Sequence, residues 1–349
     1  MNTAIGKKEP AAQAGRIVCF GEVLLRLGAT PGEMLLQTPT LHAAVGGAEA
    51  NVAVALARAG VPAALISILP DNALGSAARD ELRRHGVETS GIRFLPGRMG
   101  LYFLTPGAAL RPADIVYDRA GSTFALARPD LIDWEAELDG ASRLHLSGVT
   151  PALGANAAAA AVRAAQAATR LGVPMSFDGN YRAKLWAATD GHAPTLLRAL
   201  LAEAETAFVD HRDIALALDR AAFADTPARD IDMAADAFRH FPRLRRIAFT
   251  RRIAETAERH ELTAHLIPRE GTPLRTPPRS LTGIVDRIGA GDAFAAGILL
   301  GLWRGAPDRQ TLDYGLASAC LKHSVMGDAG LATAADLDAF LGGGVEIRR

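Results

Sequence analysis

The sequence of 349 residues predicts an α/β protein with a doubly wound, mostly parallel sheet, helices on both faces and a small β-sheet lid. Strand-like segments alternate with amphipathic helical segments along most of the chain, which is typical of a parallel sheet covered by helices. Two stretches, residues 28–46 and 92–124, instead carry strand-like pieces and turn residues without a helical pattern. Because such sheets bind ligands beyond the carboxyl ends of their strands, we expect these stretches to cover a ligand site there.

The elements follow in a regular order. "RIVCFGEVLL" starts a buried strand at Arg16, and "AEANVAVALARAG" has helical spacing up to Gly60, a residue suited to end a helix. The further predicted strands are 62–69, 142–148, 173–180, 206–210, 245–250 and 261–268, and the further predicted helices are 73–86, 155–171, a segment after "TAFVD", and segments after Gly291 and Pro307. One domain, residues 16–342, accounts for all of them.

Composition excludes several classes of protein. The 38 basic and 38 acidic residues cancel, so neither nucleic acid nor an anionic membrane is an expected partner. Residues 1–15 are polar and lack the apolar core of a signal peptide, so we expect a loose tail, and no apolar run reaches the ~20 residues of a membrane span. Cys19 and Cys320 lie in apolar segments, which indicates buried thiols. These features predict a cytoplasmic protein.

Familiar motifs are mostly absent. No Walker A loop occurs, since the only Gly-Lys pair, Gly6-Lys7, lies in the tail, and "GAGDAF" lacks the third glycine of a dinucleotide-binding fingerprint. "HELTAH" places His260 and His265 five residues apart instead of four and has the pattern of a strand, so we expect an ordinary strand there and no zinc site.

The informative motif is "DRIGAGDAFAAG", in which a glycine-rich turn leads into a helix. A helix N-terminus offers free amides and partial positive charge, and glycines let an anion approach closely, so this turn is suited to hold a phosphate. Asp292 follows at once. From the motif alone it is either a plain N-cap, worth about 1 kcal/mol, or a base beside the transferring phosphate.

Two signatures, "VGGAEANVAVALARAG" and "DRIGAGDAFAAG", resemble those of the PfkB/ribokinase family of carbohydrate kinases. The resemblance extends from Arg16 to about Leu341 and implies a ribokinase-like fold with a β lid. It implies that Asp292 is the catalytic base. It also implies that Gly289, Ala290 and Gly291 form the anion hole for the phosphoryl group.

The segments "GLYFL", "YDRAGS", "HLSGVTPAL", "FDGNYRAKLW" and "LKHSVMGD" resemble the 2-keto-3-deoxygluconate kinase branch of that family. This implies ATP-dependent phosphorylation of a terminal hydroxyl of a small sugar acid. Fructokinase, ribokinase or nucleoside kinase activity, or a non-catalytic sugar-binding protein, remain the alternatives. The substrate-binding positions implied are Gly46, Gly47, Asn51, Tyr102, Tyr117, Arg119 and Arg182. Guanidinium groups suit a carboxylate substrate, and we expect Arg119, on the lid, to be wetter than Arg182.

The sequence departs from the family at the nucleotide. The usual Asn-x-x-Glu segment is "DHRD", so Asp210 and Asp213 are expected to organise Mg²⁺ through water, and the glycine-rich stretch after "RIAFT" is replaced by "RRIAETAERHE". The implied nucleotide-binding positions are Asn180, Asp210, Thr250, Gly289, Gly291, Lys322 and His323. The resemblance implies ATP and Mg²⁺ as cofactors, leaves a monovalent cation open, and favours a homodimer or larger oligomer through the lid.

Overall fold

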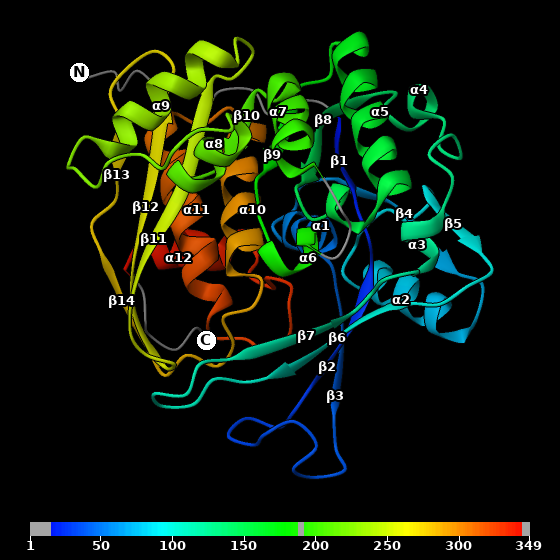
Figure 1. Cartoon of the computed structure of the whole chain (residues 1–349). Helices are drawn as coiled ribbons and strands as arrows, with labels where there is room; N and C mark the ends of the chain where they lie inside the picture. The colour runs from blue at the N-terminus through cyan, green and yellow to red at the C-terminus, as the bar shows by residue number, and fades with distance from the viewer. Residues whose placement is uncertain (1–14, 188–191, 344–349) are drawn as a thin grey trace, which may run out of the picture.

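The computed structural model describes residues 15–187 and 192–343, so the tail expected over residues 1–15 lies, apart from Gly15, outside the described residues. Ten strands form the main sheet (Figure 1). In spatial order they are β13 (Leu274–Arg275), β12 (Arg259–Pro268), β11 (Arg246–Thr256), β10 (Thr206–Phe208), β9 (Met175–Asp178), β8 (Ala141–Ser147), β1 (Arg16–Phe20), β4 (Ala63–Pro70) and β5 (Ile92–Leu95), with β14 (Arg279–Thr282) paired to β12. From β5 to β11 every neighbouring pair is parallel, as the alternating pattern predicts.

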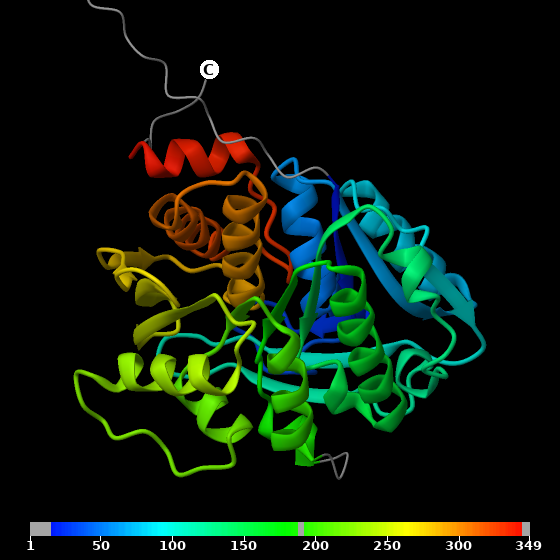
Figure 2. The ribbon, with the colours of Figure 1, turned by 90° about the horizontal axis from the view of Figure 1, so that it is seen from above.

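Helices cover both faces of this sheet, and Figure 2 shows the two layers on either side of it. One layer contains α1 (Ala48–Arg58), α2 (Ala73–Arg84), α10 (Ala290–Trp303), α11 (Asp308–Lys322) and α12 (Ala334–Leu341). The other contains α3 (Thr123–Leu126), α4 (Trp134–Glu137), α5 (Ala155–Leu171), α6 (Ala183–Ala187), α7 (Ala193–Glu203), α8 (His211–Ala217) and α9 (Arg229–His240), with a 3₁₀ turn at Pro151–Leu153. The predicted helices 155–171 and 73–86 are therefore confirmed.

Two apolar cores, one on each face of the sheet, hold the layers together. Strand β1 supplies both, because alternate residues of a strand point to opposite faces: Val18 and Phe20 join one core and Ile17 and Cys19 the other. Both cysteines are free and buried, as the sequence predicts. Helix α10 lies centrally in its layer and is buried along almost its whole length. It is therefore a rigid support for the turn that precedes it.

The lid is a separate four-stranded sheet in the order β3 (His42–Gly46), β2 (Leu24–Gly28), β6 (Gly100–Thr105) and β7 (Asp114–Asp118). It crosses the end of the main sheet where β1 finishes (Figure 1). Its limits differ from the predicted ones. The lid already begins at Leu24, whereas β5, expected in the lid, pairs with β4 in the main sheet. The reason is that β1 and β2 are separated only by residues 21–23, a break that apolar periodicity does not reveal.

Strands β11 and β12 form a long antiparallel hairpin whose tip meets the lid. The amide of Ala257, at the tip, donates to the carbonyl of Ala109 in the β6–β7 loop at 2.8 Å. His260 and His265 both lie on β12, which confirms the strand predicted for "HELTAH". The hairpin thus occupies the place of the expected glycine-rich loop and closes one side of the ligand region.

Within the described ranges, no helix is both long enough and apolar enough to cross a bilayer.

Candidate active site

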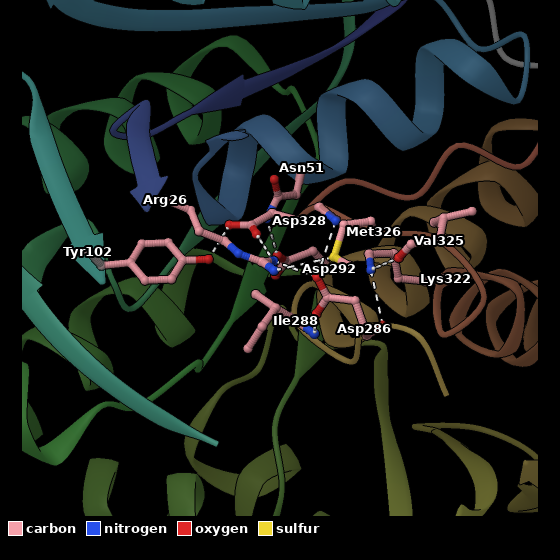
Figure 3. Close-up of polar contacts among 11 residues, drawn as sticks. Arg26, Asn51, Tyr102, Asp286, Ile288, Asp292, Lys322, Val325, Met326 and Asp328 are labelled. Carbon is pink, nitrogen blue, oxygen red and sulfur yellow. Dashed lines mark hydrogen bonds and ion pairs between the residues drawn. The ribbon is translucent and has the colours of Figure 1, made fainter. Parts of the chain in front are cut away.

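Asp292 lies in the first turn of α10 but does not cap it. The N-cap is Gly289, which adopts the left-handed conformation (φ 78°), so the helix has no side-chain capping bond at this end. The carboxylate of Asp292 is instead buried, with 9% of the residue exposed, and accepts a hydrogen bond from the Asn51 amide at 2.7 Å (Figure 3). Burial raises the pKa of Asp292 to about 7, although the bond from Asn51 and the charge of Arg182 oppose the rise. A carboxylate with this pKa can accept a proton near neutral pH.

The glycine turn before Asp292 has an open anion-binding face. Within the described part of the chain, the amides of Gly289, Gly291 and Asp292 donate to no acceptor, whereas the Ala290 amide donates to the Arg287 carbonyl at 3.3 Å. Gly291 is exposed, and a Cβ there would meet nothing within 4 Å. Three free amides at a helix N-terminus can cradle a phosphoryl group.

Glycines of both signatures are required by close contacts around Asp328, which follows α11. A Cβ on Gly289 would lie 1.7 Å from the Asp328 carbonyl oxygen, and one on Gly46 would lie 2.3 Å from an Asp328 carboxylate oxygen. Gly47 has φ 143°, and its Cβ would meet the Glu22 carbonyl oxygen at 2.2 Å. The two sequence signatures, far apart in the chain, are therefore packed against the same few residues.

Two further carboxylates lie near Asp292. Asp178 ends β9, and Asp213 is in the first turn of α8, where its Oδ2 accepts from the Asp210 amide at 2.9 Å. Burial and the neighbouring Asp292 and Asp213 raise the pKa of Asp178 well above its usual range. Burial and Asp210 raise the pKa of Asp213 to about 6. Carboxylates crowded in this way favour a cation between or beside them.

Asp210 has a different role in the same segment. Its carboxylate accepts from the amides of Arg212 and Asp213 as the N-cap of α8 and pairs with the Arg212 guanidinium at 2.5 Å. Its partly buried side chain is thus already occupied by α8 and Arg212. Among the two residues expected to organise Mg²⁺, Asp213 therefore has the freer oxygen.

The two arginines expected to bind substrate are exposed in the opposite order to the prediction. Arg119 is only 7% exposed, because its guanidinium pairs with the buried Glu22 at 2.7 Å through Nε and 2.5 Å through Nη2. Arg182 is exposed, and its charge acts on Asp178, Asp213 and Asp292. The expectation of a wetter Arg119 was wrong, since the lid strand β7 carries this residue toward the end of β1.

The lid tyrosines face the turn before α10. Tyr102 on β6 and Tyr117 on β7 are cross-strand neighbours with ring centroids 6.4 Å apart. The Tyr102 hydroxyl donates to Asp328 at 2.6 Å. On the neighbouring strand β2, Arg26 donates through Nη1 to Asp286 at 2.6 Å and to Asp328 at 2.9 Å (Figure 3). This buried network ties the lid to the glycine turn.

Beside this network lies a cavity of about 250 Å³, bounded by the β6–β7 loop, the β11–β12 hairpin and residues 284–288. His260 lines it, is 1% exposed, and has no hydrogen-bond partner for either ring nitrogen within the described part of the chain. Burial lowers the pKa of His260 to about 4, and the nearby charges of Arg252 and Arg287 lower it further in the same direction. Among the described residues, neither of these two arginines forms an ion pair with a carboxylate.

The other predicted nucleotide positions are spread around this region. Thr250 is half-buried on β11, and Asn180 follows β9 with a positive φ of 39°. Lys322 and His323, at the end of α11, are 1% and 4% exposed. Their side chains bond to backbone carbonyls: His323 to Ala319 at 2.7 Å, and Lys322 to two loops. Both therefore lie beneath the surface of the site.

Comparison with known proteins now identifies the class. Residues 14–334 match the description of the pfkB family carbohydrate kinases, so the chain belongs to this family and is a sugar kinase. The chain is 34% identical to 2-dehydro-3-deoxygalactonokinase of Haloferax volcanii, over 94% of this chain and 97% of that one. It is 28% identical to 2-dehydro-3-deoxygluconokinase of Thermoproteus tenax, over 92% of each. The solved structure of 2-dehydro-3-deoxygluconokinase from Thermotoga maritima has a TM-score of 0.88 and 33% identity, over 94% of this chain and 99% of that one.

Sequence reasoning missed several residues of the site: Glu22, Arg26, Asp178, Asp286 and Asp328. Two signals could have found some of them. Glu22 and Asp178 follow or end buried parallel strands at their carboxyl ends, where ligand sites of such sheets lie. Arg26 is a lone charge in the apolar run "VLLRLG".

Proposed function

We propose that this enzyme transfers phosphate from ATP to a terminal hydroxyl of a 2-keto-3-deoxy sugar acid, and that this acid is 2-keto-3-deoxygluconate, as the sequence resemblance implies. One observation carries the proposal: Arg182 is exposed and forms no ion pair among the described residues, yet it lies close enough to Asp292 for its charge to oppose the raised pKa of that carboxyl. A carboxylate-bearing substrate supplies the missing partner, and a neutral sugar does not. The two relatives that align over most of the chain support the same substrate class. Their names differ in the sugar acid, which is the 2-dehydro-3-deoxy form of galactonate in one and of gluconate in the other.

In this mechanism Asp292 accepts the proton of the attacking hydroxyl. Asn51 holds the carboxylate by its 2.7 Å hydrogen bond, and burial keeps its pKa near neutrality. The free amides of Gly289, Gly291 and Asp292 stabilise charge on the transferring group, which is the main task in phosphoryl transfer. The side of the site that takes the sugar is lined by Gly46, Gly47, Tyr102 and Tyr117. The lid excludes water from it.

Mg²⁺ and ATP are expected for a kinase, and the residues present fit both. Asp213 and Asp178 are the carboxylates suited to hold hydrated Mg²⁺, and Asp210 acts by positioning Asp213. When bound, the metal neutralises phosphate charge. We propose that Arg252 and Arg287, which have no acidic partners, bind the phosphates of ATP in place of the missing glycine-rich loop, next to Thr250 and Asn180.

The test is ADP release with ATP over a panel of both 2-keto-3-deoxy acids, fructose, ribose and a nucleoside. We expect kcat/KM for an acid to exceed that for neutral sugars by about 10² or more, since a charged hydrogen bond is worth ~1.5–3 kcal/mol and an unpaired arginine costs as much. Arg182→Leu should remove most of this preference, and Arg182→Lys should restore part. A parent enzyme that prefers fructose or ribose contradicts the sugar-acid assignment, and one that releases no ADP with any sugar contradicts catalysis.

A substitution at Arg119 needs a separate experiment, because Arg119 also forms an ion pair with Glu22 and its loss affects stability. Arg119→Leu leaves the 1%-exposed Glu22 side chain buried without its ion-pair partner, with only the Ser122 hydroxyl among the described residues still donating to it, so we expect lower stability as well as weaker substrate binding. The double variant Arg119→Leu with Glu22→Gln separates the two effects. If the double variant regains stability relative to Arg119→Leu but does not regain the preference for the acid, then Arg119 binds the substrate.

We also propose a cytoplasmic enzyme that forms a homodimer or larger oligomer through the lid. The lid sheet has two edge strands, β3 and β7, and Val116 on β7 is 51% exposed. An exposed strand edge pairs readily with a second copy. Light scattering should give a dimer or larger mass for the parent and a smaller mass for Val116→Lys. An unchanged monomer for both contradicts this assembly.

A further inference from the structure

The ammonium of Lys322 is buried directly beneath the turn that leads to Asp292. Lys322 is the last residue of α11, and its residue exposure is 1%. Nζ donates to the carbonyl oxygens of Val325 at 3.1 Å and of Asp286 at 3.3 Å (Figure 3). Among the described residues no carboxylate lies within ion-pair distance of it, so its polar partners are backbone carbonyls.

These carbonyls belong to the two loops that build the active site. Asp286 precedes the glycine turn, and its carboxylate accepts from the Ile288 amide at 3.0 Å and from the Gly327 amide at 3.2 Å. Val325 belongs to the loop that carries Asp328. Lys322 therefore places one positive charge at the junction of the 286–288 and 325–328 loops, close to the phosphate-binding amides.

A charge buried in this way is costly unless its surroundings are arranged for it. Here burial lowers the pKa of Lys322 overall, although the nearby negative charges of Asp286 and Asp328 oppose this change more than the positive charge of Arg26 adds to it. Converging backbone carbonyls are the ligands that K⁺ uses in proteins, and an ammonium group is a compact point charge that can take the same ligands. The carbonyls that could hold a monovalent metal are thus already bonded to a side chain.

We propose that Lys322 is a built-in monovalent cation: its ammonium fills a K⁺-like carbonyl site, joins the two loops, and makes turnover independent of added K⁺. This rests on the proposed function of the glycine turn as the phosphate cradle. It resolves the open question of a monovalent cation in favour of the chain's own charge. It also assigns Lys322 to positioning rather than to direct contact with the nucleotide.

The experiment measures kcat of the full-length enzyme with ATP and its best sugar, in K⁺, NH₄⁺ or tetramethylammonium salts at constant ionic strength. The parent should change by less than about twofold between these salts. Lys322→Met, which keeps the apolar stem without the charge, should lose about tenfold or more in tetramethylammonium, or ~1.4 kcal/mol, and recover in part with NH₄⁺ or K⁺. Lys184→Met, at an exposed lysine on α6, is the control and should show neither effect.

Thermal unfolding supplies a readout that does not depend on the substrate. The Tm of Lys322→Met should rise with K⁺ or NH₄⁺ relative to tetramethylammonium, and the Tm of the parent should not. A parent whose rate or Tm depends strongly on K⁺ overturns the proposal, and so does a Lys322→Met variant with the parental rate in tetramethylammonium. If Lys322→Met does not fold, the salt dependence of the parent alone decides. Absence of ADP release by the parent contradicts the proposed function instead, and the Tm comparison still tests Lys322.

Discussion

Asp210 and Asp292 are both aspartates at the beginning of a helix, yet their surroundings give them opposite properties. Asp210 caps α8 by accepting from the amides of Arg212 and Asp213 and pairs with the Arg212 side chain. Although burial pushes the pKa of Asp210 upward, these bonds to Arg212 lower it overall. Asp292 makes no cap, bonds to Asn51, and has a pKa raised to about 7 by burial.

The difference shows what separates a structural carboxylate from a base. Position in the first turn is shared, so the helix dipole alone does not decide the role. What differs is the source of hydrogen bonds. Backbone amides and a guanidinium stabilise the charge of Asp210, whereas Asp292 has one amide donor in a buried site and stays ready to take a proton.

The largest expected effect comes from Asp292→Asn. It keeps size and removes the proton acceptor, so kcat should fall by about 10²–10⁴. The folded state disfavours the charged form of Asp292, a penalty that grows as pH rises from about 4 to about 7, so at pH 8 the variant should be no less stable than the parent. Asp308→Asn is the matched control, because Asp308 lies in the first turn of α11 and pairs with Arg246. Turnover of Asp292→Asn within a few-fold of the parent would mean that Asp292 is no base.

The next effect concerns pH. For the parent, log kcat/KM should fall as pH drops through about 7, where Asp292 becomes protonated. Asn51→Leu removes the hydrogen bond that lowers this pKa, so the acidic limb should move upward by about one pH unit or more. If Asn51→Leu raises KM but leaves the acidic limb of the pH profile in place, then Asn51 contacts only the substrate.

A metal titration compares the two acids of "DHRD". Asp213→Ala should raise the Mg²⁺ concentration for half-maximal rate by about tenfold, the lower end of what an outer-shell partner contributes. Asp225→Ala, at an exposed aspartate that pairs with Arg229, is the control. Identical titrations for Asp213→Ala and the parent would place this segment outside the metal site.

The smallest effect is expected for Asp210→Ala, and it completes the comparison with Asp292. Loss of the cap of α8 should lower the free energy of unfolding by about 1 kcal/mol. Its Mg²⁺ requirement should rise less than that of Asp213→Ala, because Asp210 acts through Asp213. Urea unfolding and the same metal titration measure both. A metal requirement equal to or larger than that of Asp213→Ala would make Asp210 a direct metal partner.

The sequence by itself determined the fold class, most elements and the family. Alternating β and α segments, with helix ends at residues such as Gly60, follow from local periodicity and capping, which are properties of neighbouring residues. The two glycine signatures were also visible in the sequence. Their glycines are required because close backbone contacts at Gly47 and Gly289 leave no room for a side chain.

Only the tertiary structure decided the state of the charged residues. Arg119 and Glu22 are 97 positions apart in the sequence, and Arg26 and Asp328 are 302 positions apart. No local sequence pattern therefore predicts that either pair is buried. Local sequence likewise placed Asp210 and Asp292 alike at helix starts. Their pKa values diverge because burial and hydrogen-bond donors come from other elements, and these long-range contacts exist only in the folded chain.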